Sequence, residues 1–223
     1  MKIFILKLII KYRKLEKFLL WLLKDISIEI YGKKIKCYIA DMSDAQTFRE
    51  VFLKGEYDKE LGDPKKVLDL GSNVGYSILF FRAKYPKAII YGYEANFKTF
   101  DKLKKNVEGL DNIFVYNKAI SDKEGVETMY LGTSSASSSL IDRFEGDSSV
   151  AQIECIELPK ENFDLIKFDI EGTEHKVFKN PTNTKYIIGE IHYDLGEGIE
   201  LDNFDLETEK ISKYREKVWG RIK

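Results

Sequence analysis

The segment Lys65–Phe81 reads KKVLDLGSNVGYSILFF and places a glycine-rich turn between two apolar runs. Residues 66–70 have the length of a buried strand, and residues 75–85 have the length of a helix. A strand that enters a helix through a tight glycine turn is typical of ligand-binding α/β sheets. The segment therefore predicts the first strand–helix unit of such a sheet.

The alternation of strand and helix patterns continues after this segment. We expect strands at 88–94, 112–120, 163–170 and 185–193, helices at 96–109 and 171–179, an extra strand at 125–132, a polar loop at 133–144 and a final helix at 204–218. Repeated β-α-β units predict a doubly wound α/β fold with a mostly parallel sheet and helices on both faces. Ligands of such sheets bind beyond the carboxyl ends of the strands.

Upstream of the sheet, residues 26–63 predict a β-hairpin followed by a cap helix. Apolar and polar residues alternate at 26–31 and 34–40, on both sides of a turn at Gly32. A helical pattern follows at 43–57, with Ser43 or Asp44 as its cap and Gly55 near its end.

Residues 1–25 predict a basic amphipathic helix. Residues 1–24 hold seven Lys or Arg residues against the single Glu16, and their longest unbroken apolar run, Phe18–Leu23, is too short to span a membrane. One interpretation is a helix packed on its own domain or on a partner subunit. The other is peripheral contact with an anionic membrane, at its inner face.

The composition limits the possible partners and the compartment. The net charge of −1 gives no basic field for nucleic acid, so no nucleic-acid partner is expected. The only cysteines, Cys37 and Cys155, lie far apart without a C-x-x-C motif, which favours a reducing, cytoplasmic setting.

The acid in the first turn indicates which ligand the turn holds. Asp69, Gly71 and Gly75 form D-x-G-x-x-x-G, which lacks the middle glycine of a dinucleotide turn, and Asn73 stands near that place. A carboxylate repels a pyrophosphate but suits a cationic amino group with a sulfonium nearby, so we expect S-adenosylmethionine. The predicted contacts in this turn are Asp69, Gly71, Ser72, Asn73, Gly75 and Tyr76.

The tips of the next two strands predict the rest of the cofactor site. Glu94 ends the second strand, where an acid accepts hydrogen bonds from ribose hydroxyls, and Ala95 follows it. At the tip of the third strand Asn117, Lys118 and Ala119 are the candidates for contact with the adenine, chosen by their position.

At these residues the chain resembles the class I S-adenosylmethionine-dependent methyltransferases, and more closely the FkbM family. The resemblance covers about residues 27–194 and rests on VLDLGSNVGY, YEANFKTFDKLKKN, NKAISD, SSSL, IKFDIEGTEHKVF and EIHYD. It implies that residues 64–223 form an S-adenosylmethionine-binding methyltransferase domain. It also implies O-methylation of a hydroxyl on a sugar, glycan, lipid or secondary metabolite.

The chain departs from the family pattern at two places. Ala95 stands where the family usually has a proline, although the acid before it is kept. The family fold ends in an antiparallel strand pair, yet only VWGRIK remains here, beginning at the last residue of the predicted final helix. We therefore expect the strand pair to be missing, and the edge of the acceptor pocket to be incomplete or supplied by another subunit or the N-terminal segment.

The acceptor side is predicted from the fourth and fifth strands. Asp169 ends an apolar strand, and the resemblance implies that it lies near the methyl donor. Glu190 and His192 end the next strand on one side, and an ordinary histidine pKa suits His192 as a base near neutral pH. These three side chains could instead bind a divalent metal, but no tight spacing motif supports this, and no metal is predicted.

Two other functions remain open on the sequence alone. One is a degenerate methyltransferase-fold protein that binds a partner or a membrane, which the missing strand pair and the basic N-terminus favour. The other is an oxidoreductase with a nucleotide cofactor, which Asp69 and the absent middle glycine disfavour. The leading prediction remains a methyltransferase that takes a small-molecule or glycan acceptor.

Overall fold

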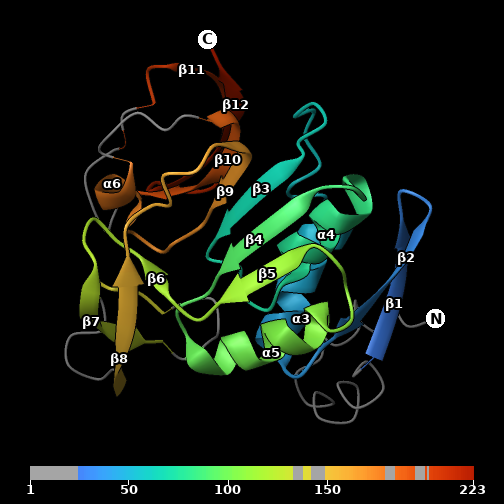
Figure 1. Cartoon of the computed structure of the whole chain (residues 1–223), viewed down its shortest axis with the longest axis horizontal. Coiled ribbons are helices and arrows are strands. Elements are labelled where there is room, and N and C mark those ends of the chain that lie inside the picture. The colour runs from blue at the N-terminus through green and yellow to red at the C-terminus, as the bar shows by residue number, and fades with distance from the viewer. Residues whose placement is uncertain (1–24, 133–137, 142–148, 179–183, 194–198, 200) are drawn as a thin grey trace.

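The computed structural model describes residues 25–132, 138–141, 149–178, 184–193, 199 and 201–223 (Figure 1). The predicted N-terminal helix and most of the loop predicted at 133–144 lie outside these residues. None of the helices within the described ranges is long and apolar enough to cross a membrane.

A seven-stranded sheet runs through the described chain in the order β11-β12-β10-β9-β3-β4-β5. β3, β4, β5, β9 and β10 pair in parallel, whereas β12 runs antiparallel to both β10 and β11. This arrangement confirms the predicted α/β fold with a mostly parallel sheet. The strands are β3 (Lys66–Leu70), β4 (Ile89–Tyr93), β5 (Ile113–Tyr116), β9 (Phe163–Phe168), β10 (Thr184–His192), β11 (Phe204–Lys210) and β12 (Arg215–Ile222).

Successive residues of the central strands bury their side chains on opposite faces of the sheet. Val67 of β3 and Leu165 of β9 belong to the apolar core on one face. Leu68 and Ile166, their immediate neighbours in the chain, belong to the core on the other face. All four are almost entirely buried, which explains why these strands read as continuous apolar runs.

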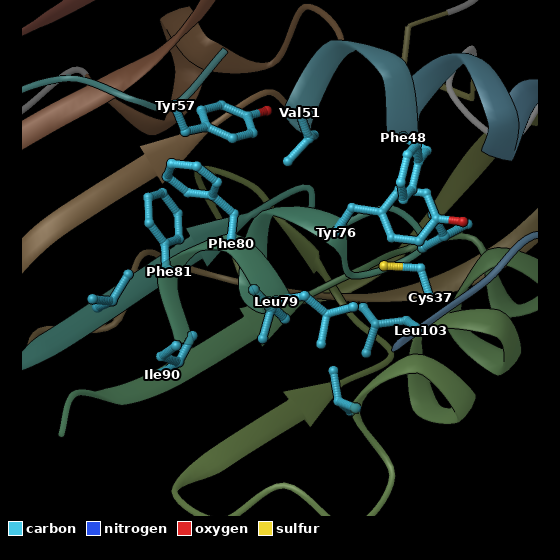
Figure 2. Close-up of a cluster of buried hydrophobic side chains, with 14 of the residues drawn as sticks. Cys37, Phe48, Val51, Tyr57, Tyr76, Leu79, Phe80, Phe81, Ile90 and Leu103 are labelled. Carbon is cyan, nitrogen blue, oxygen red and sulfur yellow. The ribbon is translucent and has the colours of Figure 1, made fainter. Parts of the chain in front are cut away.

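Within the described part of the chain, three helices cover the first face of the sheet. They are α3 (Met42–Phe48), α4 (Tyr76–Lys84) and α5 (Phe97–Val107). Figure 2 shows their side chains meeting in one cluster, to which Phe48, Tyr76, Leu103 and Cys37 all belong. The predicted helix at 43–57 is α3 followed by a π-helical turn, η2 (Arg49–Leu53), and the side chain that caps α3 is Asp41.

The predicted hairpin is present as β1 (Asp25–Ile30) and β2 (Lys33–Tyr38), which pair antiparallel. Its two turn residues, Tyr31 and Gly32, have φ angles of 48° and 67°. Two left-handed residues in succession give the turn the twist that two-residue hairpins require. The hairpin packs beside α4 and α5, where the Tyr76 hydroxyl donates to the carbonyl oxygen of Tyr38 at 2.6 Å.

A second, three-stranded sheet follows the third parallel strand. It has the order β6-β8-β7, with β6 (Ala119–Ile120), β7 (Gly125–Leu131) and β8 (Ser149–Ile156). β7 confirms the extra strand predicted at 125–132. β8 was not predicted, because its exposed and buried residues alternate only in its second half.

The prediction of a final helix and a missing strand pair is wrong. Residues 204–218 begin with β11, and β12 pairs with both β11 and β10, so the sheet is complete at this edge. Glu and Lys favour a helix in isolation, but the hydrogen bonds of the sheet outweigh this weak preference. Charged residues also protect an edge strand from pairing with other chains, which accounts for the composition of β11.

The predicted helix at 171–179 shortens to α6 (Glu174–Val177). Glu171 and Gly172 have φ angles of 53° and 100°, which a right-handed helix does not contain. The chain therefore turns sharply after β9 before α6 begins.

Candidate active site

Two cavities meet at the carboxyl ends of β3 and β9. The first encloses about 660 Å³ of empty space and the second about 1170 Å³, both partly open to solvent. Four residues line both of them: Gly71, Asn73, Asp169 and Glu171. This is the edge of a doubly wound sheet at which ligands are expected.

Gly71 allows β3 and β9 to approach closely at this point. Its φ is 74°, and a Cβ atom there would lie 1.9 Å from the backbone oxygen of Asp169. Gly75, with a φ of 88°, is the N-cap of α4, and a Cβ atom there would lie 3.3 Å from Cγ of Leu103. The glycine turn is therefore required by backbone conformation and by space, as the sequence indicated.

Glu94 lies at the tip of β4 and lines the first cavity. Its two carboxylate oxygens accept hydrogen bonds from the backbone N–H groups of Asn73 and Asn96, each at 2.8 Å. Burial raises the pKa of Glu94 to about 7, although these two hydrogen bonds oppose the shift. The acid is thus fixed in orientation beside the glycine turn.

The three residues predicted at the third strand tip take different positions. Lys118 and Ala119 line the first cavity, together with Ala95. Asn117 does not line it; its amide donates to the carbonyl oxygens of Glu94 and Ala95, at 2.8 and 2.9 Å. Asn117 therefore fixes the backbone after β4.

Asp69 is placed differently from the expectation that it faces the ligand. It has no exposed surface, and its carboxylate accepts from the Ser77 hydroxyl at 2.5 Å and pairs with the Lys167 ammonium at 3.0 Å. Lys167 also donates to the carbonyl oxygen of Gly71 at 2.6 Å. Asp69 lines neither cavity, so in this structure it braces the glycine turn through Lys167.

Lys167 was not predicted as a site residue. Burial alone would lower its pKa, but the charges of Asp69 and Asp169 outweigh burial and raise it. A lysine inside the apolar strand FDLIKF was the available signal, because lysines are almost never buried without a charged partner.

A group of acidic side chains surrounds His192 at the end of β10. His192 Nδ1 lies 3.0 Å from Glu174 Oε1, and His192 Nε2 lies 3.4 Å from Glu190 Oε1 and 3.7 Å from Glu171 Oε2. Glu174 is itself buried and accepts from the backbone N–H groups of Ile170 and Gly172, at 3.3 and 3.2 Å. It therefore holds both the imidazole and the turn after β9.

These carboxylates change the expected ionisation of His192. Burial alone would lower its pKa, but the hydrogen bond to Glu174 and the charges of Asp169, Glu174 and Glu171 raise it to about 9. The ordinary histidine pKa assumed from the sequence does not apply here. Burial and the charge of Asp169 also raise the pKa of Glu190, to about 7.

The second cavity has a charged wall formed partly by β12. Arg215 and Lys217 of this strand line it, and Lys217 pairs with Glu56 at 2.6 Å. Ser72 and Tyr76 of the glycine turn also face this cavity. The strand pair thus completes the wall, and Arg215 and Lys217 went unrecognised because a helix was predicted there.

The chain is similar to known proteins in both sequence and fold. Residues 69–208 match the family described as the methyltransferase FkbM domain. No curated protein matches the chain. Methanococcus jannaschii fibrillarin, a pre-rRNA processing protein, is 15% identical, with a TM-score of 0.50, over 89% of this chain and 82% of that one.

Two further solved structures are similar at lower TM-scores. A SAM-dependent methyltransferase from Aquifex aeolicus is 16% identical with a TM-score of 0.44, over 79% of this chain and 93% of that one. Aeropyrum pernix fibrillarin, solved with natively bound S-adenosyl-L-methionine, is 12% identical with a TM-score of 0.44, over 88% and 82%. Because the FkbM match spans more than half of the chain, this protein belongs to the FkbM methyltransferase family.

Proposed function

We propose that the chain transfers the methyl group of S-adenosylmethionine to a hydroxyl of a polar acceptor such as a sugar or glycan. The observation that carries this proposal is the meeting of two cavities at Gly71, Asn73, Asp169 and Glu171. One cavity is suited to the donor and the other to the acceptor, and the reacting atoms would meet where they join. Lipids and secondary metabolites that carry hydroxyls belong to the same acceptor class.

The lining of the first cavity supports its assignment to the donor. Glu94 would accept from the ribose hydroxyls, and Ile120, Met129 and Leu140 give apolar walls for the adenine near Lys118 and Ala119. The methionine part would then lie over Gly71. Since Asp69 is paired with Lys167, Asp169 is the carboxylate placed to attract the positively charged end of the donor.

The second cavity suits a polar acceptor. Its lining includes Gln46, Thr47 and Lys54 beside the charged residues of β12. Hydroxyl-rich molecules bind such surfaces through several hydrogen bonds, which also hold them in one orientation. Apolar residues are a minority of the lining, which favours a sugar or glycan over a lipid chain at this position.

The chemistry is an in-line displacement at the methyl carbon. The acceptor oxygen forms a bond to this carbon while the bond to sulfur breaks, and S-adenosylhomocysteine leaves. The enzyme mainly aligns the two reactants, because the sulfonium is already a good leaving group. The hydroxyl proton must also be removed, and Glu190, which lines the second cavity, lies where it could receive this proton. His192, predicted as the base, is buried and lines neither cavity, and its raised pKa keeps it protonated near neutral pH.

The binding-protein alternative has lost one of its two supports. It relied on a missing C-terminal strand pair, and β11 and β12 supply that pair. Its other support, the basic N-terminal segment, lies outside the described residues.

Titration calorimetry with S-adenosylmethionine tests the proposal. We expect Glu94→Ala to weaken binding by about tenfold or more, because hydrogen bonds to a charged group contribute roughly 1.5–3 kcal/mol. Glu108→Ala, at an exposed position just after α5, should bind like the parent. A parent chain that gives no binding heat at millimolar ligand would contradict the proposal.

A further inference from the structure

We propose that Asp169, Glu171 and His192 bind one divalent first-row metal ion at the junction of the two cavities. The binding site is independent of the methyl donor. Its role in activating the acceptor hydroxyl, described below, rests on the proposed function.

The three side chains converge closely enough to share an ion. One ligand atom from each lies within 4.8 Å of the other two. Ligands held at about 2.0–2.2 Å from one ion are at most about 4.4 Å apart, so only a small contraction would close the site. Nε2 of His192 and Oε2 of Glu171 are already within this limit, at 3.7 Å.

The Nε2 atom of His192 is the independent sign of a missing ligand. The residue is 2% exposed, and this buried atom has no hydrogen-bond partner among the residues that the structure describes. Its nearest carboxylate oxygens stand off at 3.4 and 3.7 Å, beyond the usual range of a hydrogen bond. Such a gap between a ring nitrogen and carboxylates is the space that a shared cation fills.

Glu174 provides the support that metal-binding histidines usually have. Its Oε1 atom lies 3.0 Å from Nδ1 of His192, so Nδ1 carries an N–H and Nε2 faces Glu171 and Asp169. An ion that binds Nε2 would displace the proton of this nitrogen. The same carboxylate holds the backbone of Ile170 and Gly172. One buried acid thus orients the imidazole and the turn that carries both proposed carboxylate ligands.

The turn itself is held in an unusual conformation. Glu171 is a non-glycine residue with a φ of 53°, and its carbonyl oxygen accepts from the Ser139 hydroxyl at 2.6 Å. A left-handed residue at this point allows Asp169 and Glu171 to converge with His192. The structure therefore fixes the ligand-bearing backbone before any ion arrives.

The ligand types indicate which ions fit. Two carboxylates and one imidazole suit Mn²⁺, Fe²⁺ or Zn²⁺ better than Ca²⁺, which prefers oxygen ligands alone. Asp169 and Glu171 line both cavities, so an ion on them is open to a bound acceptor. The ion would bind the acceptor oxygen and make its proton easier to lose, while Glu190 beside it receives the proton.

Electron paramagnetic resonance with Mn²⁺ alone tests the site, because the signal of free Mn²⁺ falls as the ion binds. We expect one Mn²⁺ per chain in the parent. Glu171→Gln and His192→Asn should each weaken binding by at least about tenfold. His175→Asn, which changes the only other histidine in the chain, should bind like the parent.

The result that overturns the site is a parent chain that leaves millimolar Mn²⁺ free, or a folded His192→Asn variant that binds as tightly as the parent. Circular dichroism melting shows whether each variant is folded. If His192→Asn does not fold, Glu171→Gln decides, since its side chain is 15% exposed and its shape is kept. S-adenosylmethionine is absent, so failure here is distinguishable from failure of donor binding.

Discussion

Gly71 matters both for the fold and for the proposed donor site, because it contacts the Asp169 backbone and lines the first cavity. Its backbone is left-handed, and the Asp169 carbonyl occupies the space of a side chain. Gly109 has nearly the same φ, 73° against 74°, but no atom of the described residues lies within 4 Å of a Cβ atom built there. Comparing an alanine substitution at each glycine therefore separates the cost of the left-handed backbone from the cost of crowding.

We expect Gly71→Ala to lower the free energy of unfolding well beyond Gly109→Ala. The left-handed conformation alone costs about 1–2 kcal/mol for a residue with a Cβ atom, and this cost applies to both variants. Overpacking against a backbone atom adds roughly 1–3 kcal/mol or more at Gly71. Urea denaturation measures both, and equal losses would show that β3 and β9 are not in close contact at this point.

We expect Glu94 to make donor binding sensitive to pH. In the free chain burial raises its pKa from 4.5 to about 7, so that near pH 6 the buried acid is largely protonated. The unfolded chain ionises at lower pH, so this acid favours folding most at low pH and that contribution is lost as pH rises through 7. Ribose hydroxyls donate to the ionised form, so the donor should lower this pKa.

The affinity for S-adenosylmethionine should therefore rise as pH increases from 6 to 8 and then level off. In Glu94→Gln the position cannot ionise, so we expect weaker binding that lacks this rise. Calorimetry in buffers of matched ionic strength measures both curves. An unchanged rise in the glutamine variant would assign the pH dependence to another group.

At the scale of elements, the last two strands decide whether the second cavity has a complete wall. Val218 of β12 is 2% exposed and lies opposite Thr208 of β11, which is exposed. In the predicted helix these two residues could not be cross-strand partners. Replacing each residue in turn by aspartate therefore tests the strand pair.

We expect Val218→Asp to destabilise the chain strongly, by several kcal/mol, because it places an unpaired carboxylate in the core. Thr208→Asp should change the free energy of unfolding by roughly 0.5 kcal/mol or less, as most exposed substitutions do. Thermal melting followed by circular dichroism compares the two. Similar losses for both variants would contradict the observed pairing.

For the whole molecule, sequence reasoning succeeded where local pattern and long-range structure agree. Asp69 lies in a short apolar strand, and Glu94 and Asp169 directly follow two others. The order of these strands along the chain is enough to place their tips at one edge of the sheet. The hairpin at Gly32 was predicted for the same reason, since its turn residues and alternation agree.

The parts that could not be predicted depend on contacts between distant segments. β11 consists largely of residues that favour helices, and only its pairing with β12 makes it a strand. No spacing rule predicts that Asp69 pairs with Lys167, or that Glu174 contacts His192. A single sequence shows which residues end the strands, but it does not show which of these residues face the cavity.

The most direct test of the central claim is a crystal structure of the chain grown with S-adenosylmethionine. The account predicts the ribose hydroxyls on Glu94, the adenine between Ile120 and Leu140, and the methyl group directed past Asp169 into the second cavity. A donor bound elsewhere, or one whose methyl group points away from the second cavity, would contradict the account.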